Sequence, residues 1–179
     1  MLIGETDPEK MRPAQRAAYD RIASGPRGGV PFPFLAMLDA PQFAAAIQGV
    51  GEAIRYHGVL DDRLREIAIL AAAAAWGSGY EWAYHDAIAA KLGMTPGERQ
   101  AVLDGSARGL APAEALCVGY IRTAVLERRA DRDLLAGLVA ALGREAATEI
   151  TTIAGYYPLL ALFLGAGQLD SPLPERIAA

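Results

Sequence analysis

The chain has 179 residues, of which 53% are hydrophobic, and a formal net charge of −4. This length is usual for one domain and the composition supplies enough apolar side chains for a core, so we expect a single domain over residues 1–179. A net negative chain attracts neither a phosphate backbone nor an anionic membrane surface, which disfavours nucleic acid and membrane as partners. A small-molecule substrate or a protein partner is the remaining expectation.

The sequence also indicates where the protein works. Its single cysteine, Cys117, cannot form a disulfide within the chain, and the N-terminus lacks a basic segment followed by an apolar run. We therefore expect a cytoplasmic protein. The longest uncharged apolar stretch, from Ile67 to Gly79, is rich in alanine and too short to span a bilayer, so it predicts a helix buried in protein.

Periodic apolar residues predict helices along the first part of the chain. The segment 13–24 begins with a proline suited to a first helical turn, and the glycine- and proline-rich segment 25–33 predicts a loop. Asp39 then precedes a second predicted helix as its capping residue, and this helix ends near His57. Apolar residues recur in it at helical spacing at Phe43, Ile47, Val50 and Ile54.

Two helices separated by a glycine break are predicted next. Asp61 or Asp62 is the expected cap of the first helix, which carries the alanine-rich stretch and breaks at Gly77-Ser78-Gly79. The second is predicted from Tyr80 to Leu92, and Gly93 ends it because glycine readily adopts a left-handed conformation. The break allows the second helix to fold back along the first.

The rest of the chain is also predicted to be helical. Thr95-Pro96-Gly97-Glu98 has the form of a capping box with proline at the first helical position, which predicts a short helix to about residue 105. The C-terminal helices, within 112–168, are predicted at 112–128, 131–142 and 144–164, and an extended tail at 170–179. No segment alternates apolar and polar residues between hairpin turns, so the predicted fold class is all-α.

The two histidines, His57 and His85, are the imidazoles available for proton transfer near neutral pH. Glu81 lies four residues before His85 on the same helix face, where a carboxylate can orient the ring. Glu66 belongs to the preceding helix and can approach the same point if the chain folds back at the glycine break. The candidate catalytic residues are therefore Glu66, Glu81 and His85.

Structural explanations of the same residues stay open. Ser78 and Glu81 also form a capping box that would only satisfy backbone N–H groups at a helix start. Glu81 and His85 could equally be a solvated pair worth about 0.2–0.5 kcal/mol. Aromatic residues interleaved with them favour a partly desolvated setting instead: Tyr80, Trp82 and Tyr84.

Other polar groups favour structural roles, and neither a metal nor another cofactor is expected. His57 lies at a predicted helix end, where a cation complements the helix dipole. Cys117 lies in an apolar segment, which is typical of a small core residue rather than a nucleophile. No cysteine or second histidine stands at ligand spacing from His85, so the sequence predicts no metal site.

Two stretches of the chain are similar to a family motif: Leu64-Arg65-Glu66-Ile67-Ala68-Ile69-Leu70 and Trp76-Gly77-Ser78-Gly79-Tyr80-Glu81-Trp82-Ala83-Tyr84-His85. They resemble the core motif of the carboxymuconolactone decarboxylase-like and AhpD-like superfamily, and the resemblance covers about residues 35–105. The final helix, with Gly155-Tyr156-Tyr157, is similar as well. The resemblance implies an AhpD-like helical bundle that assembles into a homo-oligomer, either a trimer or a hexamer.

In the peroxidase branch of this superfamily the motif carries a glutamate, a C-x-x-C pair and a histidine four residues after the second cysteine. In this sequence the glutamate corresponds to Glu66 and the histidine to His85. Ser78 and Glu81 stand in place of the two cysteines. Peroxide reduction by that route needs one thiolate to attack and a second thiol to resolve the intermediate, so we do not expect AhpD-like peroxidase activity.

In the decarboxylase branch the family's reaction is the loss of CO2 from a carboxylated muconolactone. The resemblance to this branch implies a lyase-like site in which His85 supplies a proton to carbon, while Glu81 or Glu66 sets its tautomer. Arg63 or Arg65 would hold a substrate anion. The further expected substrate-binding residues are Ser78, Tyr80 and Trp82.

The sequence leads to three functional hypotheses. The first is a cofactor-free acid–base enzyme that decarboxylates, isomerises or hydrolyses a small carboxylated or lactone-like molecule, with Glu66, Glu81 and His85 converging at an apolar pocket. The alternative is a noncatalytic oligomeric binding protein on the same scaffold, in which His85 is a packed or interface residue. The third is a peroxidase acting through Cys117, which would need an exposed thiol with a lowered pKa.

Overall fold

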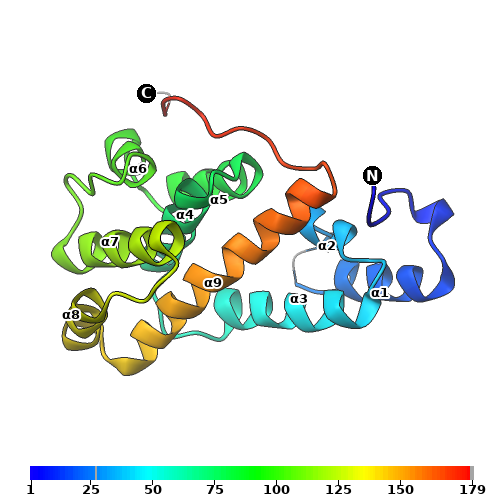
Figure 1. Cartoon of the computed structure of the whole chain (residues 1–179), viewed down its shortest axis with the longest axis horizontal. Coiled ribbons are helices and arrows are strands. Elements are labelled where there is room, and N and C mark those ends of the chain that lie inside the picture. The colour runs from blue at the N-terminus through cyan, green and yellow to red at the C-terminus, as the bar shows by residue number, and fades with distance from the viewer. Residues whose placement is uncertain (27, 178–179) are drawn as a thin grey trace. The chain divides into compact units, whose positions relative to one another are not determined.

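The computed structural model describes residues 1–26 and 28–177, so Arg27 in the predicted loop and residues 178–179 of the predicted tail lie outside it. Within these ranges every regular element is a helix and no residue is in a strand, which confirms the all-α prediction (Figure 1). The chain divides into two compact units, Met1–His57 with Leu159–Asp170 and Gly58–Pro158 with Ser171–Ala179. That the chain is a single domain stays a prediction.

Prolines begin the helices of the first unit. A proline stands at the first or second position of each, where its missing N–H breaks no hydrogen bond and its fixed φ is already helical. The helices are η1 Pro8–Lys10, α1 Pro13–Ala23, α2 Phe32–Ala36 and α3 Pro41–Tyr56. Ala18, Leu35 and Leu38 form a buried cluster in this unit.

The short helix α2 was not predicted, because it begins inside the segment 25–33 that the sequence assigns to a loop. Pro31 caps α2 and Pro33 lies in its first turn, so these prolines begin a helix rather than interrupt one. Phe34 and Leu35 are 1% and 6% exposed, and burial of their side chains stabilises this short helix.

The prediction that Asp39 caps α3 is wrong. Ala40 is the capping residue, and it makes no side-chain hydrogen bond to the helix. The Asp39 carboxylate accepts hydrogen bonds from the Gly4 backbone at 2.7 Å and from Arg12 and Gln15, each at 3.0 Å. Asp39 therefore ties the N-terminal segment to this unit instead.

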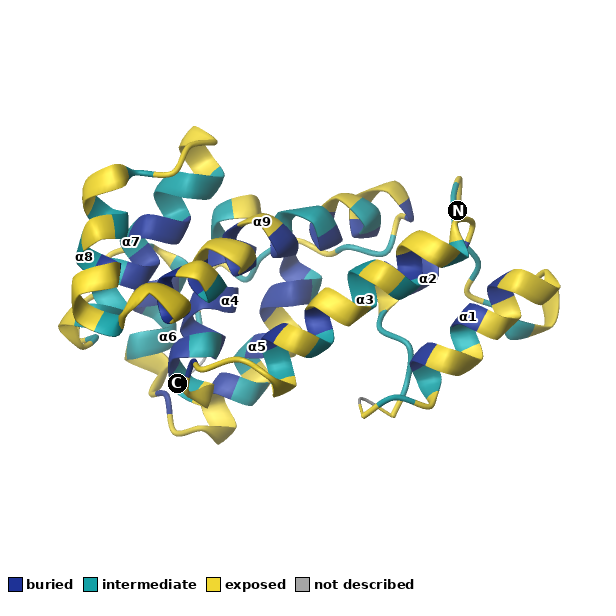
Figure 2. Cartoon of the chain, turned by 90° about the horizontal axis from the view of Figure 1, so that it is seen from below, coloured by how far each residue is buried: buried dark blue, intermediate teal, exposed yellow. Residues whose placement is uncertain are grey.

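Helix α4 is the central helix of the second unit. The helices are α4 Asp62–Trp76, α5 Gly79–Lys91, α6 Pro96–Leu103, α7 Pro112–Glu127, α8 Arg132–Leu142 and α9 Arg144–Ala166, which belongs to this unit up to Pro158. α5, α6 and α7 pack against α4, and α8 packs against α7. The alanine-rich middle of α4, residues 67–73, is at most 1% exposed, which confirms the predicted buried helix over these residues (Figure 2), whereas Trp76 at the end of α4 is 40% exposed.

Capping residues define these helices as the sequence predicts. Asp61 caps α4 by accepting a backbone N–H three residues later at 2.8 Å. Thr95 and Glu98 form the predicted capping box of α6. Gly77 and Gly93 have φ angles of 94° and 87°, in the left-handed region that glycine adopts most readily. These two glycines fix the break between α4 and α5 and the end of α5.

The long helix α9 is, among the described helices, the one that is apolar enough to cross a bilayer by length and composition. Its mean hydropathy is 1.2 over an 18-residue window, and 44% of that window is buried. A core helix of a soluble protein has the same properties, so this is weak evidence for a membrane.

The C-terminal segment packs along the start of α5. The Gly79 N–H donates to the Ser171 carbonyl at 2.9 Å, and a side chain at position 79 would collide with the carbonyl oxygens of Ser171 and Pro172. The Ile177 N–H donates to the Gln100 side chain at 2.9 Å. The segment is without regular structure over its described residues, as the sequence predicts.

Candidate active site

The turn between α4 and α5 brings residues of both helices together. Gly77 ends α4, and the Ser78 hydroxyl caps α5 by accepting the Glu81 N–H at 3.4 Å. α5 therefore folds back along α4, and Glu66 and His85, 19 positions apart, reach hydrogen-bond distance. The capping role considered for Ser78 is present in the structure.

His85 lies at the centre of a buried polar cluster. Its Nδ1 atom is 2.6 Å from Glu66 Oε2, and its Nε2 atom is 3.3 Å from the Tyr157 hydroxyl oxygen. Glu81 Oε2 lies 3.8 Å from Nε2, close enough for an ion pair but too far for a hydrogen bond. Each of these residues is at most 3% exposed. The structure thus brings the candidate catalytic residues together and adds Tyr157, and we call these residues the His85 cluster.

The Glu66 carboxylate determines which nitrogen of His85 carries a proton. As an anion, Glu66 can only accept a hydrogen bond, and the 2.6 Å contact is then made by a proton on Nδ1. In this tautomer of the neutral ring, Nε2 carries the lone pair and can accept a hydrogen bond from the Tyr157 hydroxyl. A carboxylate that orients an imidazole through Nδ1 in this way leaves Nε2 as the base.

Tyrosine rings surround the imidazole. Tyr84 and Tyr157 meet the His85 ring edge to face, with ring centroids 5.2 and 5.3 Å away. Tyr156 meets Tyr157 in the same way at 5.5 Å. Tyr84 is 42% exposed, whereas Tyr156 and Tyr157 are buried. The His85 cluster therefore has the aromatic, partly desolvated setting that the sequence indicates.

Two buried polar atoms next to the His85 cluster lack hydrogen-bond partners. Glu66 Oε1 and Arg65 Nε lie 3.7 Å apart, and neither makes a hydrogen bond to the described residues. Arg65 is held from its other side by Asp62, whose Oδ1 accepts from Nη2 at 2.7 Å. A buried polar group without a partner costs about 1–3 kcal/mol. The unused donor keeps Arg65 as the candidate that could bind a substrate anion here.

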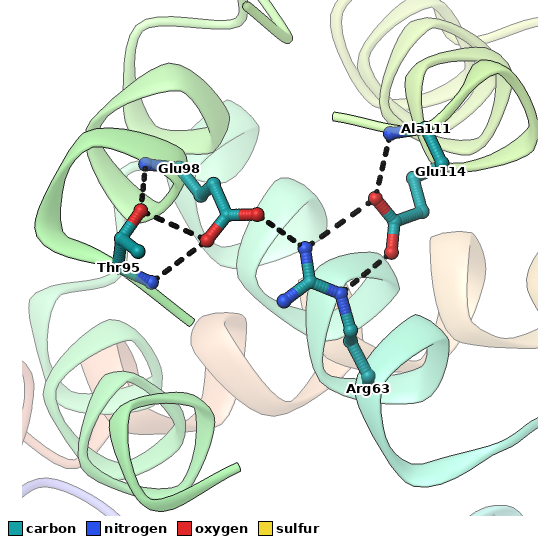
Figure 3. Close-up of polar contacts among 5 residues, drawn as sticks. All are labelled: Arg63, Thr95, Glu98, Ala111 and Glu114. Atoms are coloured by element: carbon teal, nitrogen blue, oxygen red, sulfur yellow. Dashed lines mark hydrogen bonds and ion pairs between the residues drawn. The ribbon is translucent and has the colours of Figure 1, made fainter. Parts of the chain in front are cut away.

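Arg63, the other arginine considered for anion binding, is engaged in a different network. Figure 3 shows its guanidinium between Glu98 and Glu114, each 2.7 Å from one of its nitrogens. Glu98 also closes the capping box of α6, and Glu114 accepts the Ala111 N–H at the start of α7 at 2.9 Å. The hydrogen bond to Glu114, with that to Glu98, raises the pKa of Arg63 against the opposite effect of burial. Arg63 thus joins α4, α6 and α7, and we do not include it in the site.

The remaining residues that the sequence singled out lie around these groups. Ser78 is fully buried, and Trp82, 2% exposed, lines a hollow with the C-terminal segment. Tyr80 is half-buried. Substrate binding by these residues stays a prediction, as does the apolar pocket beside His85. His57 is the exposed C-cap of α3, which fits its expected structural position.

Cys117 does not have the properties of a redox centre. Its side chain is fully buried, and burial raises the pKa of the thiol to about 12. Such a thiol stays protonated near neutral pH and is a poor nucleophile. The hypothesis of a peroxidase acting through Cys117 is therefore wrong.

Tyr157 is the member of the His85 cluster that the sequence did not assign to a site. It lies on α9, 72 positions after His85, so no local spacing connects the two residues. The sequence feature that could have indicated this role is a tyrosine on an apolar helix. A phenolic hydroxyl that is buried with such a helix needs a hydrogen-bond partner, and a polar residue such as His85 can provide one.

Comparison with solved structures identifies the fold. A variant of the debrominase Bmp8 in complex with 2,3,4-tribromopyrrole is 18% identical, with a TM-score of 0.71 over 98% of this chain and 92% of that one. The apo form of Bmp8 is 17% identical, with a TM-score of 0.70 over the same shares. An AhpD-core peroxidase-related protein from Ralstonia eutropha JMP134 is 16% identical, with a TM-score of 0.67 over 95% and 90%. At these identities the likeness concerns the fold alone.

Comparison of the sequence with protein families shows which family part of the chain is similar to. No curated protein matches the chain. The model of the carboxymuconolactone decarboxylase family matches residues 41–122, from α3 into α7, and so includes Glu66, Glu81 and His85. The chain is therefore similar to the carboxymuconolactone decarboxylase family over residues 41–122, and its fold is similar to that of an AhpD-core protein.

Proposed function

We propose that the protein is a cofactor-free acid–base enzyme in which His85 transfers a proton to or from carbon in a small carboxylated or lactone-like substrate. The observation that carries this proposal is the buried imidazole held by a carboxylate at Nδ1 and by a hydroxyl at Nε2. Burying charged groups costs free energy, and well-packed apolar residues often give equal or greater stability. A function in proton transfer accounts for this buried cluster better than packing does.

The Nε2 atom of His85 is the proposed acid–base atom. In the neutral ring it accepts a proton, and the resulting imidazolium is stabilised by Glu66 through Nδ1. Glu81, 3.8 Å from Nε2, adds a second negative charge that favours the protonated ring. The Tyr157 hydroxyl, which can donate and accept, relays the proton between Nε2 and the substrate.

For a decarboxylation, the steps follow from the same groups. The bond between the ring carbon and the carboxylate breaks, CO2 leaves, and the electron pair moves into the ring as an enolate. The unused Nε donor of Arg65 stabilises the developing negative charge on oxygen. The imidazole takes up a proton from solvent at Nε2 before this step, and that proton then passes to the carbon that lost CO2, which returns the ring to its neutral form.

Two comparisons support a small ring-shaped substrate. The family whose model matches residues 41–122 is named for the decarboxylation of carboxymuconolactone, a small lactone ring that carries carboxylates. The debrominase with a similar fold binds 2,3,4-tribromopyrrole, which is also a single small ring. We therefore propose a monocyclic lactone or related ring carrying a carboxylate.

Deuterium incorporation from D2O tests for proton transfer to or from carbon, whichever product the reaction forms. The protein is incubated in D2O with carboxymuconolactone or muconolactone, and deuterium at the ring carbons and release of CO2 are followed by NMR. We expect incorporation above the buffer rate, and a decrease of at least about a hundredfold in His85→Ala. His57→Ala is the matched control and keeps the wild-type rate, since His57 is exposed at the end of α3. Equal rates in the two variants, or no rate above buffer, would contradict the proposal.

The alternative function is that of a noncatalytic binding protein, and the 3% exposure of His85 is the observation that favours it. This alternative predicts that a lactone carboxylate binds with saturation while deuterium incorporation stays at the buffer rate. It also predicts that His85→Ala alters the unfolding temperature and no reaction rate. The same samples therefore discriminate between the two functions.

We also propose that the protein forms a homo-oligomer, a trimer or hexamer, and works in the cytoplasm. Large apolar side chains on the surface of each unit support assembly, among them Phe43 at 67% and Leu126 at 56% exposure. Light scattering during size-exclusion chromatography measures the mass of the assembly, and cell fractionation measures its location. A monomer at all concentrations would contradict the first of these proposals.

A further inference from the structure

A groove along α8 and the first half of α9 has the properties of a second binding site. It encloses about 750 Å³, within the range of pockets that hold small molecules. All the residues that line it belong to one compact unit, and none belongs to the His85 cluster. Its chemistry therefore goes beyond the proposed acid–base function.

The walls of this groove are apolar. Small and branched apolar side chains line it: Leu135, Ala136, Val139, Ala140 and Ala147. The remaining uncharged lining residues are Thr148, Thr151 and Thr152. Each of these hydroxyls donates to the carbonyl four residues earlier, at 2.8–2.9 Å. The threonines thus offer a ligand their methyl groups, and Thr148 and Thr152 also offer acceptor oxygens, because the Thr151 oxygen already binds the Tyr120 hydroxyl.

The charged groups of the groove are two arginines at opposite ends. Arg132 is the first residue of α8 and Arg144 the first residue of α9, and one residue, Gly143, separates the two helices. α8 has 11 residues and a helix rises about 1.5 Å per residue, so the two backbones stand roughly 16 Å apart along its axis. No acidic residue is among those that line the groove.

These arginines have no ion-pair partners among the described residues. Arg132 and Arg144 are exposed, and neither belongs to the ion pairs of α7, α8 or the loop between them. Arg144 also borders a smaller hollow lined by Asp61 and Glu145, but no ion pair joins it to either carboxylate. Both guanidinium groups are therefore available for an anionic ligand.

We propose that the groove binds an elongated apolar molecule with an acidic group at each end, such as a long-chain dicarboxylate. The apolar walls match a hydrocarbon body, and two cations without an acidic neighbour match two anions. A second copy of the chain seated on the same groove about a two-fold axis would bring the same two arginines against each other. Like charges disfavour that occupant.

Titration of the full ¹⁵N-labelled chain with dodecanedioate tests the proposal by NMR. We expect saturable shifts of the α8 and early α9 amides, with dodecanoate binding about tenfold more weakly and the corresponding diol weaker still. Arg132→Gln and Arg144→Gln each raise the dissociation constant for dodecanedioate about tenfold. Arg21→Gln, in the last turn of α1, is the matched control and leaves the constant unchanged.

A variant that fills the groove completes the experiment. Ala140 is exposed on the groove wall, so Ala140→Trp is expected to abolish the shifts without unfolding the chain or changing its mass in light scattering. Three results would overturn the proposal. One is the absence of saturable shifts at α8 and α9, and another is an equal constant for Arg132→Gln, Arg144→Gln and Arg21→Gln. The third is a smaller assembly for Ala140→Trp, which would show that a second copy of the chain occupies the groove.

Discussion

Arg63 and Glu66 lie one turn apart on α4. They differ in how completely their polar atoms are hydrogen-bonded. Arg63 is bound by Glu98 and Glu114, and both carboxylates also hold backbone N–H groups at the starts of α6 and α7 (Figure 3). Glu66 is more deeply buried, at 1% exposure, yet one of its oxygens has no hydrogen bond. Its other oxygen binds an imidazole that can change its protonation state.

The contrast separates a structural ion network from a candidate catalytic one. In the first network, Glu98 and Glu114 each accept a hydrogen bond from a backbone N–H at a helix start. Removing Arg63 from this network should therefore lower the free energy of unfolding. In the second, charged groups are buried, and the Arg65 Nε donor and the Glu66 Oε1 acceptor make no hydrogen bond to the described residues. Buried polar atoms of this kind are typical of catalytic sites. Substitutions on each side of α4 should therefore separate stability from activity.

The largest effect is expected for Glu66→Gln. An amide can donate a hydrogen bond to Nδ1 of His85, which favours the tautomer with its proton on Nε2, so Nε2 no longer carries the lone pair that accepts a proton. We expect the rate of deuterium incorporation to fall at least about a hundredfold, while the unfolding temperature changes little because the side-chain shape is kept. An unchanged rate would remove Glu66 from the proposed mechanism.

Arg63→Gln should show the opposite behaviour. It leaves Glu98 and Glu114 without their shared cation, but Arg63 is 31% exposed and water screens the loss. We expect the free energy of unfolding to fall by about 1–2 kcal/mol in urea titrations and the rate to stay within about twofold of the wild type. Arg16→Gln, which removes an exposed pair with Asp20, is the control and costs less than about 0.5 kcal/mol. A large loss of activity without loss of stability would return Arg63 to the site.

Tyr157→Phe has a smaller expected effect on the rate. It keeps the ring that meets His85 edge to face and removes the hydroxyl 3.3 Å from Nε2. We expect the rate to fall by about tenfold, because a relay group is lost while the base remains. Tyr156→Phe is the matched control, since it removes the neighbouring hydroxyl and keeps the ring contact with Tyr157. Equal rates for the two variants would show that Tyr157 only packs against the imidazole.

The smallest effect is expected at Cys117. Because burial raises the pKa of this thiol to about 12, it stays protonated at pH 8 and reacts slowly with iodoacetamide. Mass spectrometry should show an unmodified native chain and complete alkylation after denaturation. Cys117→Ala should leave the rate of deuterium incorporation unchanged. Rapid alkylation of the native chain would contradict the burial of this side chain.

The sequence predicts the fold well where local chemistry decides it. Asp61, Thr95 and Gly93 define helix ends through caps and left-handed turns, which depend on neighbouring residues alone. The approach of Glu66 to His85 was also predictable, because one glycine break connects the two helices that carry them.

The sequence does not predict contacts that depend on distant packing. Asp39 resembles a helix cap locally, but it binds the N-terminal segment because Arg12 and Gln15 fold onto it. Arg63 has the charge expected of an anion-binding residue, but it pairs with Glu98 and Glu114 instead. These glutamates lie on α6 and α7, and the position of Arg63 in the sequence does not show that these helices pack against α4. Tyr157 enters the His85 cluster for the same reason, since α9 is far away along the chain.

The central claim is that Glu66 fixes the tautomer of His85 and leaves Nε2 as the base. Nitrogen-15 NMR of the imidazole side chain in the full protein measures this directly, because protonated and free ring nitrogens differ in chemical shift. At a pH where the ring is neutral, we predict the proton on Nδ1 and an unprotonated Nε2, and the reverse arrangement in Glu66→Gln. A proton on Nε2 in the wild-type protein, unchanged in Glu66→Gln, would contradict the account.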